Sequence, residues 1–178
     1  MYKEKVILVD GQDNELGLME KIEAHEKGLL HRAFSVFVFN SKNELMLQQR
    51  SDNKYHSGGL WTNTCCSHPR LGETLVEAAK RRMMEEMGFT CELSHEFSFI
   101  YKAELDNNLT EHELDHVFFG FYDGLPLLNS EEAKAWKYAS VEEIKNDIQK
   151  NPQHYTEWFK IIFNRLEEHL LIKTKKSA

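Results

Sequence analysis

Charged side chains recur along RRMMEEMG, residues 81–88, in a pattern that suits cation or anion binding. Arg82 and Glu86 stand four residues apart, so on a helix they lie on one face and can form an ordinary surface ion pair. Glu86 is also a candidate Mg²⁺ ligand, because Mg²⁺ is bound by one or two carboxylates together with phosphate oxygens and water. The stretch leaves two interpretations open, a solvated helix face or a Mg²⁺ site.

A second candidate lies in WTNTCCSHPRLGE, residues 61–73, where a thiol and an imidazole stand two residues apart. On an extended chain Cys66 and His68 share one side, while Cys65 points to the other and is expected to be structural. Taken singly, a cysteine is most often a small buried hydrophobic residue and a histidine a hydrogen-bonded polar one.

Two carboxylates, Glu111 and Glu113, stand two residues apart where an apolar run begins. On a strand both point to one face, while His112 and His116 point to the other. A solvated strand edge is the common explanation of such a pair. The alternative is metal ligation, because carboxylates joined by histidines suit Mn²⁺, Zn²⁺ or Fe²⁺ and do not exclude Mg²⁺.

Strands predominate in the first part of the chain that must position these groups. Residues 5–10 form a short apolar run that ends in Asp-Gly, which predicts a strand and a turn. Residues 34–40 and 44–49 predict a hairpin. The connection over residues 50–73 shows little periodicity, and a long loop of this kind in a compact domain is usually functional.

Helices and a second hairpin are predicted further on. Thr74 and Glu77 form a capping box for a helix that Gly88 ends. Residues 97–103 and 114–122 predict two strands joined by a polar loop. In addition, a short helix is capped by Ser140 and Glu143, and a last helix runs from about residue 156 to 171. The order predicts a mixed α/β protein.

Composition limits the classes of protein that remain. We expect a single domain over residues 1–178, with frayed ends at 1–4 and 173–178. The net charge of −7 opposes non-specific nucleic-acid binding, and no apolar run reaches the roughly 20 residues of a membrane helix. Three cysteines are too few for a disulfide framework. We therefore expect a cytoplasmic monomer that acts on a small molecule, without nucleic-acid or membrane partners.

The loop, Glu73 and the helix that ends in paired glutamates resemble the Nudix box, in which helical carboxylates hold Mg²⁺ against a diphosphate. The resemblance implies an α/β fold with a Nudix-like mixed β-sheet sandwiched between α-helices. Two positions depart from the box: Arg82 stands where a metal-binding glutamate is expected, and Ser67 stands where glycine is expected. The missing carboxylate weakens a hydrolase interpretation and leaves diphosphate binding.

The chain also resembles the type I isopentenyl-diphosphate isomerases from about residue 6 to 158, through motifs that include KIEAHEKGLLHRAFS, QQRSDNKYHSGGLWTN and YKAELDNNLTEHELDHVF. The resemblance implies catalytic residues Cys66, Glu113 and Tyr101. It implies a divalent metal (Mn²⁺, Zn²⁺ or Mg²⁺) on His25, His31, His68, Glu111 and Glu113, and a second ion, Mg²⁺, on Glu86. It implies substrate contacts from Lys21, Arg50, Lys54, Arg82 and Trp158. His56, His95, His154 and His169 are given no role.

The implied reaction moves the double bond of isopentenyl diphosphate to give dimethylallyl diphosphate, so one carbon gains a proton and another loses one. We expect Cys66 and Glu113 to form the opposed acid–base pair, with Trp158, or else Trp61, facing the developing positive charge. Two alternatives remain: a Nudix hydrolase of a diphosphate substrate, and a non-catalytic domain stapled by its metal.

Overall fold

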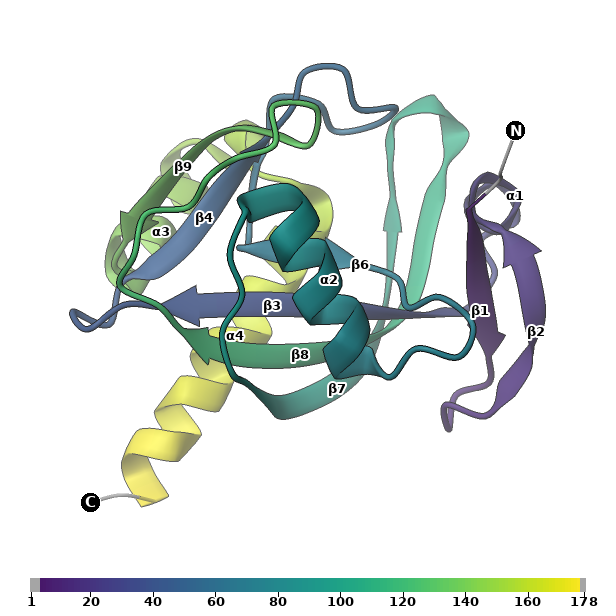
Figure 1. Ribbon diagram of the computed structural model, residues 1–178, viewed down its shortest axis with the longest axis horizontal. Coiled ribbons are helices and arrows are strands. Elements are labelled where there is room, and N and C mark those ends of the chain that lie inside the picture. Colours follow the sequence, from purple (N-terminus) through teal and green to yellow (C-terminus); the bar gives the residue numbers. More distant parts are fainter. Residues whose placement is uncertain (1–3, 177–178) are drawn as a thin grey trace.

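The computed structural model describes residues 4–176, and the side chains of residues 4–172 (Figure 1). Its strands are β1 (Lys5–Val9), β2 (Glu15–Glu20), β3 (His31–Phe39), β4 (Leu45–Arg50), β5 (Trp61–Thr62), β6 (Cys65–Ser67), β7 (Leu93–Glu104), β8 (Thr110–Phe121) and β9 (Ala133–Ala139). Its α-helices are α1 (Lys21–Lys27), α2 (Leu75–Met87), α3 (Val141–Lys150) and α4 (Glu157–Lys176). Short 3₁₀ helices cover Asp106–Asn108 and Pro152–His154.

Strand β3 is the centre of a mixed sheet. It runs parallel to β8 along its whole length and antiparallel to β1 and β6. β7 extends the sheet as the antiparallel partner of β8, and β9 pairs with β4. Strands β6 and β8 therefore flank β3 on opposite sides, which brings residues from the middle and the late part of the sequence to one place.

Alternation along β3 and β4 divides the core into two layers. Phe37 on β3 and Leu47 on β4 pack with Phe159 and Ile162 of helix α4. Residues one position away, such as Val38, pack with helix α2 instead, because successive side chains on a strand point to opposite faces. Figure 1 shows α2 in front of the sheet and α4 behind it. The expected fold, a mixed sheet sandwiched between helices, is confirmed.

Helix α2 begins and ends as its sequence predicts. The Thr74 side chain accepts from the Glu77 backbone N–H, and the Glu77 carboxylate accepts from the Thr74 backbone N–H, so the capping box is complete. Gly88 follows the last turn with φ 70°, where a Cβ would lie 2.3 Å from the Leu127 carbonyl oxygen. These residues set where α2 begins and ends, and its buried face packs on the sheet while Arg82 and Glu86 reach the cavity.

Several expectations about the elements need correction. The strand expected from residue 34 starts at His31. The expected hairpin of β3 and β4 is paired directly only at Phe39 and Leu45, because further along the Thr64 hydroxyl lies between the two strands and bonds to both. The connection over residues 50–73 contains β5 and β6. Helix α4 continues through Lys176, so residues 173–176 are not frayed; residues 1–3, 177 and 178 lie outside the described part of the chain. Elements β2, α1 and β9 were not predicted.

Among residues 4–176, no helix combines the length and the apolar character that a crossing of a lipid bilayer requires.

Candidate active site

One cavity gathers the residues that the sequence singles out. Of the thirteen predicted site residues, all but His31 line it. They come from α1, β4, the following loop, β6, α2, β7, β8 and α4: Lys21, His25, Arg50, Lys54, Cys66, His68, Arg82, Glu86, Tyr101, Glu111, Glu113 and Trp158. His31 is fully buried behind the wall of the cavity.

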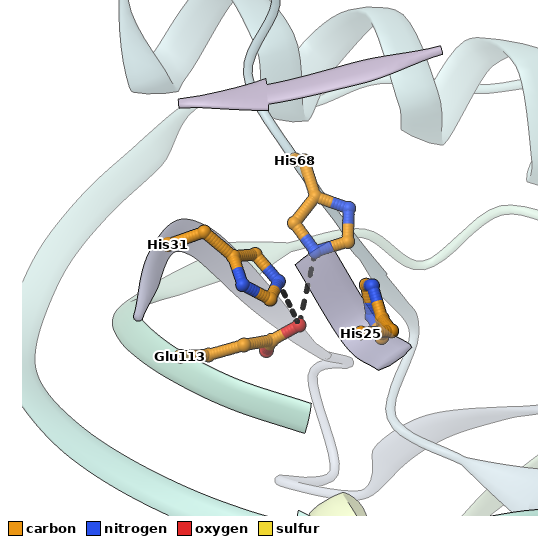
Figure 2. Close-up of side chains that lie close together, drawn as sticks. All are labelled: His25, His31, His68 and Glu113. Atoms are coloured by element: carbon orange, nitrogen blue, oxygen red, sulfur yellow. Dashed lines mark hydrogen bonds and ion pairs between the residues drawn. The ribbon is translucent and has the colours of Figure 1, made fainter. Parts of the chain in front are cut away.

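Three imidazoles surround one carboxylate at the deep end of this cavity (Figure 2). One potential ligand atom from each of His25, His31, His68 and Glu113 lies within 4.8 Å of the others. His68 Nε2 is 2.9 Å and His31 Nε2 is 3.5 Å from the same oxygen, Glu113 Oε1. We call these four residues the histidine cluster.

The histidine cluster fits a divalent metal ion. Backbone carbonyls of Lys21 and Leu29 bind Nδ1 of His25 and His31 at 2.7 and 2.8 Å. Such contacts place the proton on Nδ1 and leave the Nε2 lone pair as the ligand. His31 Nε2 is buried and makes no hydrogen bond. Burial lowers the pKa of His25, and it lowers the pKa of His68 to about 4, so both rings are neutral at neutral pH, as metal ligation requires.

Strand register explains how distant residues meet in the histidine cluster. His31 on β3 stands opposite Glu113 on the parallel strand β8, and Tyr101 on β7 stands opposite Glu113 from the other side. The expected division of faces is also present: Glu111 and Glu113 face the cavity, while His112 and His116 bond to Gly28 and Asp13 elsewhere.

Glu111 and Glu113 differ in charge although they share one partner. Burial works to raise the pKa of Glu113, but the nearby His31 ring and the hydrogen bond from His68 outweigh it and hold that pKa well below its usual range. Burial, together with the charge of Glu113, raises the pKa of Glu111 well above its usual range. Tyr101 Oη lies 2.7 Å from Glu113 and 3.0 Å from Glu111, so its single proton can go to Glu113 while protonated Glu111 donates to the phenol.

Cys66 reaches the cavity from β6, on the other side of β3 from Glu113. Burial raises the pKa of Cys66, and Arg50 offsets only part of that rise, so the thiol keeps its proton at neutral pH. Cys65 is fully buried in the core against α2, as expected for a structural residue. The cavity therefore has a neutral thiol on one side and an ionised carboxylate on the other.

Cationic side chains line another part of the cavity and pair there with carboxylates. Arg82 Nη2 lies 2.6 Å from Glu86 and 3.1 Å from Glu132, and Lys54 also binds Glu132. Lys21 Nζ is paired with a further carboxylate, Glu4, at 3.1 Å. We call Lys21, Lys54, Arg82, Glu86 and Glu132 the cation end. With Glu4 counted, its three cations are balanced by three carboxylates, so an anion that binds there exchanges partners with Glu132 or arrives with a cation for Glu86.

An aromatic wall closes the cavity. Trp158 is buried, and its Nε1 donates to Thr62 Oγ1 at 2.9 Å. The Arg50 guanidinium carbon stands 5.0 Å from the centre of its ring, so the tryptophan face already accommodates a positive charge. Trp61, the alternative tryptophan, lies outside the cavity lining and contacts Lys137.

Sequence reasoning gave no site role to six lining residues, and three of them make contacts that bear on the site; the six are Ser35, Gln48, Tyr55, His56, Ser67 and Glu132. Gln48 is buried and donates to Glu86 at 2.8 Å, and Glu132 joins two of the cations. His56, which was given no role, lines the cavity, and its ring centre lies 5.6 Å from that of Trp158, with the two ring planes at 85°. The sequence carries no local sign of Glu132, since its partners lie 50 and 78 residues upstream. His56 sits in KYHSGG, where only the run of turn-forming residues marks a functional loop.

Comparison with known proteins identifies the class first. Residues 29–159 match the NUDIX domain family, and a crystal structure from Deinococcus radiodurans superposes with a TM-score of 0.76 at 18% identity, covering 91% of this chain and 98% of that one. A MutT protein from Methanosarcina mazei superposes with a TM-score of 0.64 at 21% identity, covering 78% and 94%. The chain has the Nudix fold.

Sequence relatives then specify the family. The isopentenyl-diphosphate Delta-isomerase 2 of Aromatoleum aromaticum is 51% identical, covering 92% of this chain and 87% of its own length. The isopentenyl-diphosphate Delta-isomerase of Pectobacterium atrosepticum is 50% identical, covering 93% and 92%. The chain therefore belongs to the type I isopentenyl-diphosphate Delta-isomerase family of the Nudix superfamily.

Proposed function

We propose that this protein interconverts isopentenyl diphosphate and dimethylallyl diphosphate by adding a proton to one carbon and removing one from another, as a step of isoprenoid biosynthesis. The observation that carries the proposal is the pairing of a neutral thiol, Cys66, with an ionised carboxylate, Glu113, in one buried cavity. A double-bond shift needs both an acid and a base, and the relatives at about 50% identity carry the isomerase name.

The substrate dictates why such groups must be buried. An unactivated alkene is a very weak base, so its protonation develops positive charge on a tertiary carbon. Water would trap that carbon as an alcohol, and a closed site prevents this side reaction. Cys66 and Glu113 come from strands on opposite sides of β3, so they can act on two carbons of one substrate. In the reverse direction the donor and the acceptor exchange roles.

Tyr101 and Trp158 complete the catalytic half of the cavity in this proposal. The Tyr101 hydroxyl holds Glu113 by a 2.7 Å hydrogen bond and so fixes the direction in which its carboxylate points. The Trp158 ring faces the developing charge, which a tryptophan stabilises by roughly 0.5–2 kcal/mol in a dry pocket. Its own position is set by the hydrogen bond from Nε1 to Thr62.

In this proposal the histidine cluster binds a divalent ion, and Glu111 is its fifth ligand. The ion is Mn²⁺, Zn²⁺ or Mg²⁺. Glu111 is not one of the four residues of the histidine cluster. Its carboxyl group contacts the same Tyr101 hydroxyl as Glu113 does, which places it next to the cluster. When bound, the ion supplies positive charge beside Glu113 and thereby sets the proton affinity of that carboxylate.

Diphosphate binding is assigned to Lys21, Arg50, Lys54 and Arg82, with a Mg²⁺ ion on Glu86. The arginines offer paired N–H donors that match phosphate oxygens. Glu86 accepts hydrogen bonds from Arg82 and Gln48, which hold its carboxylate in a fixed orientation toward the cavity. We further propose that the protein acts as a cytoplasmic monomer and that residues 1–178 form one domain.

The direct test is proton NMR of the purified protein with isopentenyl diphosphate and Mg²⁺ in D₂O. We expect a second allylic methyl signal and incorporation of deuterium into the product. Release of inorganic phosphate without an allylic product would indicate a Nudix hydrolase instead, and an unchanged spectrum from folded, metal-loaded protein would indicate a non-catalytic domain.

The proposed thiol role is tested by Cys66→Ala, with Cys91→Ala as the matched control. Cys91 is a free, half-buried cysteine outside the cavity. Because acid–base groups contribute about 10²- to 10⁴-fold to rate, Cys66→Ala should lose that much turnover while Cys91→Ala keeps wild-type turnover. Near-wild-type turnover of Cys66→Ala with unchanged metal content would refute the role.

A further inference from the structure

A second group of histidines lies on the opposite face of the β7–β8 pair from the active site. Ser98 on β7 stands opposite His116 on β8, and its Oγ lies 2.9 Å from His116 Nδ1. The same hydroxyl lies 2.9 Å from His95 Nε2. The two imidazole nitrogens therefore converge on one point, beside the turn between β1 and β2. We call His95, Ser98, His116 and Asp13 the outer cluster.

Asp13 orients one of the two rings. Its Oδ2 lies 3.1 Å from His116 Nε2. An imidazole whose Nε2–H faces a carboxylate has its free lone pair on Nδ1, which is the atom aimed at Ser98 and His95. Asp13 is itself fixed, because its other oxygen accepts from Arg32 Nε at 2.7 Å and its backbone oxygen accepts from Arg32 Nη2 at 2.9 Å.

The outer cluster has the construction of the histidine cluster. Its ring centres are 5.6 Å apart, within the 4.8–5.8 Å that separates the rings of His25, His31 and His68. In the outer cluster Asp13 faces Nε2 of His116, and in the histidine cluster backbone carbonyls hold Nδ1 of His25 and of His31, so each of these three rings has its other nitrogen free for the centre. A carboxylate–histidine pair of this kind is the usual support of a metal-bound imidazole.

The Ser98 hydroxyl links the two rings of the outer cluster. The Ser98 hydroxyl has one proton, so it donates to His116 Nδ1 and must accept from His95 Nε2. Burial lowers the pKa of His116 and favours its neutral ring, which has a lone pair to give to an ion. His95 is exposed, so an ion can enter from solvent on its side and take the place of the Ser98 hydrogen bonds.

We propose that His95 and His116 bind a second divalent transition-metal ion, of which Zn²⁺ is the type, with Asp13 as the positioning residue behind His116. Imidazole ligands select borderline ions such as Zn²⁺, Ni²⁺ or Cu²⁺ over Mg²⁺ and Ca²⁺, which prefer oxygen. Water completes the coordination on the exposed side. The bound ion ties the β7–β8 pair to the β1–β2 turn through Asp13, and the site does not depend on the proposed isomerase activity.

The site is tested by counting Zn²⁺ on the full chain across buffered concentrations of free Zn²⁺. The wild-type protein should bind one ion more than His95→Ala, whose side chain is exposed and whose loss leaves the core intact. Equal zinc content of the two proteins at every concentration would overturn the proposal.

Asp13→Asn separates a metal site from a structural contact. Loss of such a supporting carboxylate typically weakens metal affinity 10- to 100-fold, and we expect that loss at the second site only. Asn tolerates the positive φ of 67° at this position. Glu15→Gln is the matched control, because Glu15 also pairs with Arg32, at 2.7 Å, but makes no contact with His116. Equal zinc affinity of Asp13→Asn and Glu15→Gln would contradict the assigned role of Asp13.

Discussion

The two ends of the cavity are built in different ways. Groups in the histidine cluster are held by strand register and by backbone carbonyls, and all four of its residues are buried. Groups at the cation end are held by one another: Arg82 and Lys54 retain about a fifth of their side-chain exposure and share Glu132. The first end is rigid before any ligand arrives, whereas the second exchanges ion-pair partners when an anion binds.

Because the histidine cluster is rigid and the cation end is exchangeable, we expect the first to control kcat and the second to control KM. Rigid, dry groups stabilise a transition state because they need no rearrangement during the reaction. Exchangeable ion pairs contribute to binding of the ground state and the transition state alike, so their loss changes KM more than kcat. The four predictions below test that separation.

The largest effect is expected for Glu113→Gln, which removes both a metal ligand and the proposed base. Turnover should fall about 10²- to 10⁴-fold, the usual contribution of a positioned acid–base group. Glu104→Gln, on exposed β7 outside the cavity, should retain wild-type kcat. Steady-state kinetics with isopentenyl diphosphate measures both. A Glu113→Gln enzyme that changed only in KM would place catalysis elsewhere.

At the cation end, Arg82→Gln should raise KM about 10- to 100-fold, since a hydrogen bond to a charged group is worth roughly 1.5–3 kcal/mol. The neighbouring Arg81 is the control: its guanidinium binds Glu73 and Glu85 outside the cavity, so Arg81→Gln should keep the wild-type KM. The comparison of the two ends fails if Arg82→Gln lowers kcat as strongly as Glu113→Gln does.

Local patterns in the sequence predicted the helices whose capping residues are visible in the sequence. Thr74 with Glu77 and Ser140 with Glu143 are capping boxes in the sequence and in the structure. Helix α1 was missed because its seven residues are too few to show a helical period, although the αL glycine after it, Gly28, marks its end. Strand β2 was missed because it is short and its alternating apolar residues, Leu16 and Leu18, are exposed and do not enter a core.

The site was predictable where residue type and spacing within one element suffice, as for Glu111 and Glu113. Contacts between elements were not, because they depend on register. No sequence pattern near His31 indicates that it lies beside Glu113, which is 82 positions later. Only the resemblance to a family predicted that both belong to one metal site. No motif pointed to Glu132, so the exchange of ion pairs at the cation end emerged only from the fold.

A smaller effect is expected on the pH dependence of stability, through His56, which packs against Trp158 in the cavity. Burial lowers the pKa of His56 to about 3, with the charge of Arg50 adding to the effect. Below the unfolded-state pKa of about 6.5 the unfolded chain takes up a proton that the folded protein refuses, so stability is fully present above pH 6.5 and falls as the pH drops toward 3. Between pH 7 and pH 5 the loss from His56 is about 2 kcal/mol.

Urea unfolding at the two pH values measures that loss. His56→Gln should lose about 2 kcal/mol less than wild type, while His154→Gln, at an exposed position, should follow wild type. An identical pH dependence of wild type and His56→Gln would mean that His56 keeps its ordinary pKa in the folded protein, which would contradict the lowered pKa that its buried position implies.

The smallest effect separates the stability of helix α2 from its role in binding. Thr74→Ala removes the N-cap and should lower the free energy of unfolding by about 1 kcal/mol. Ser140→Ala removes the same capping box from α3, which contributes no residue to the cavity lining, and should cost a similar amount. Because Arg82 and Glu86 lie in later turns of α2 and are held by Glu132 and Gln48, both variants should keep the wild-type KM. A higher KM in Thr74→Ala alone would show that the helix cap, and not the mutual ion pairing of its side chains, positions the cation end.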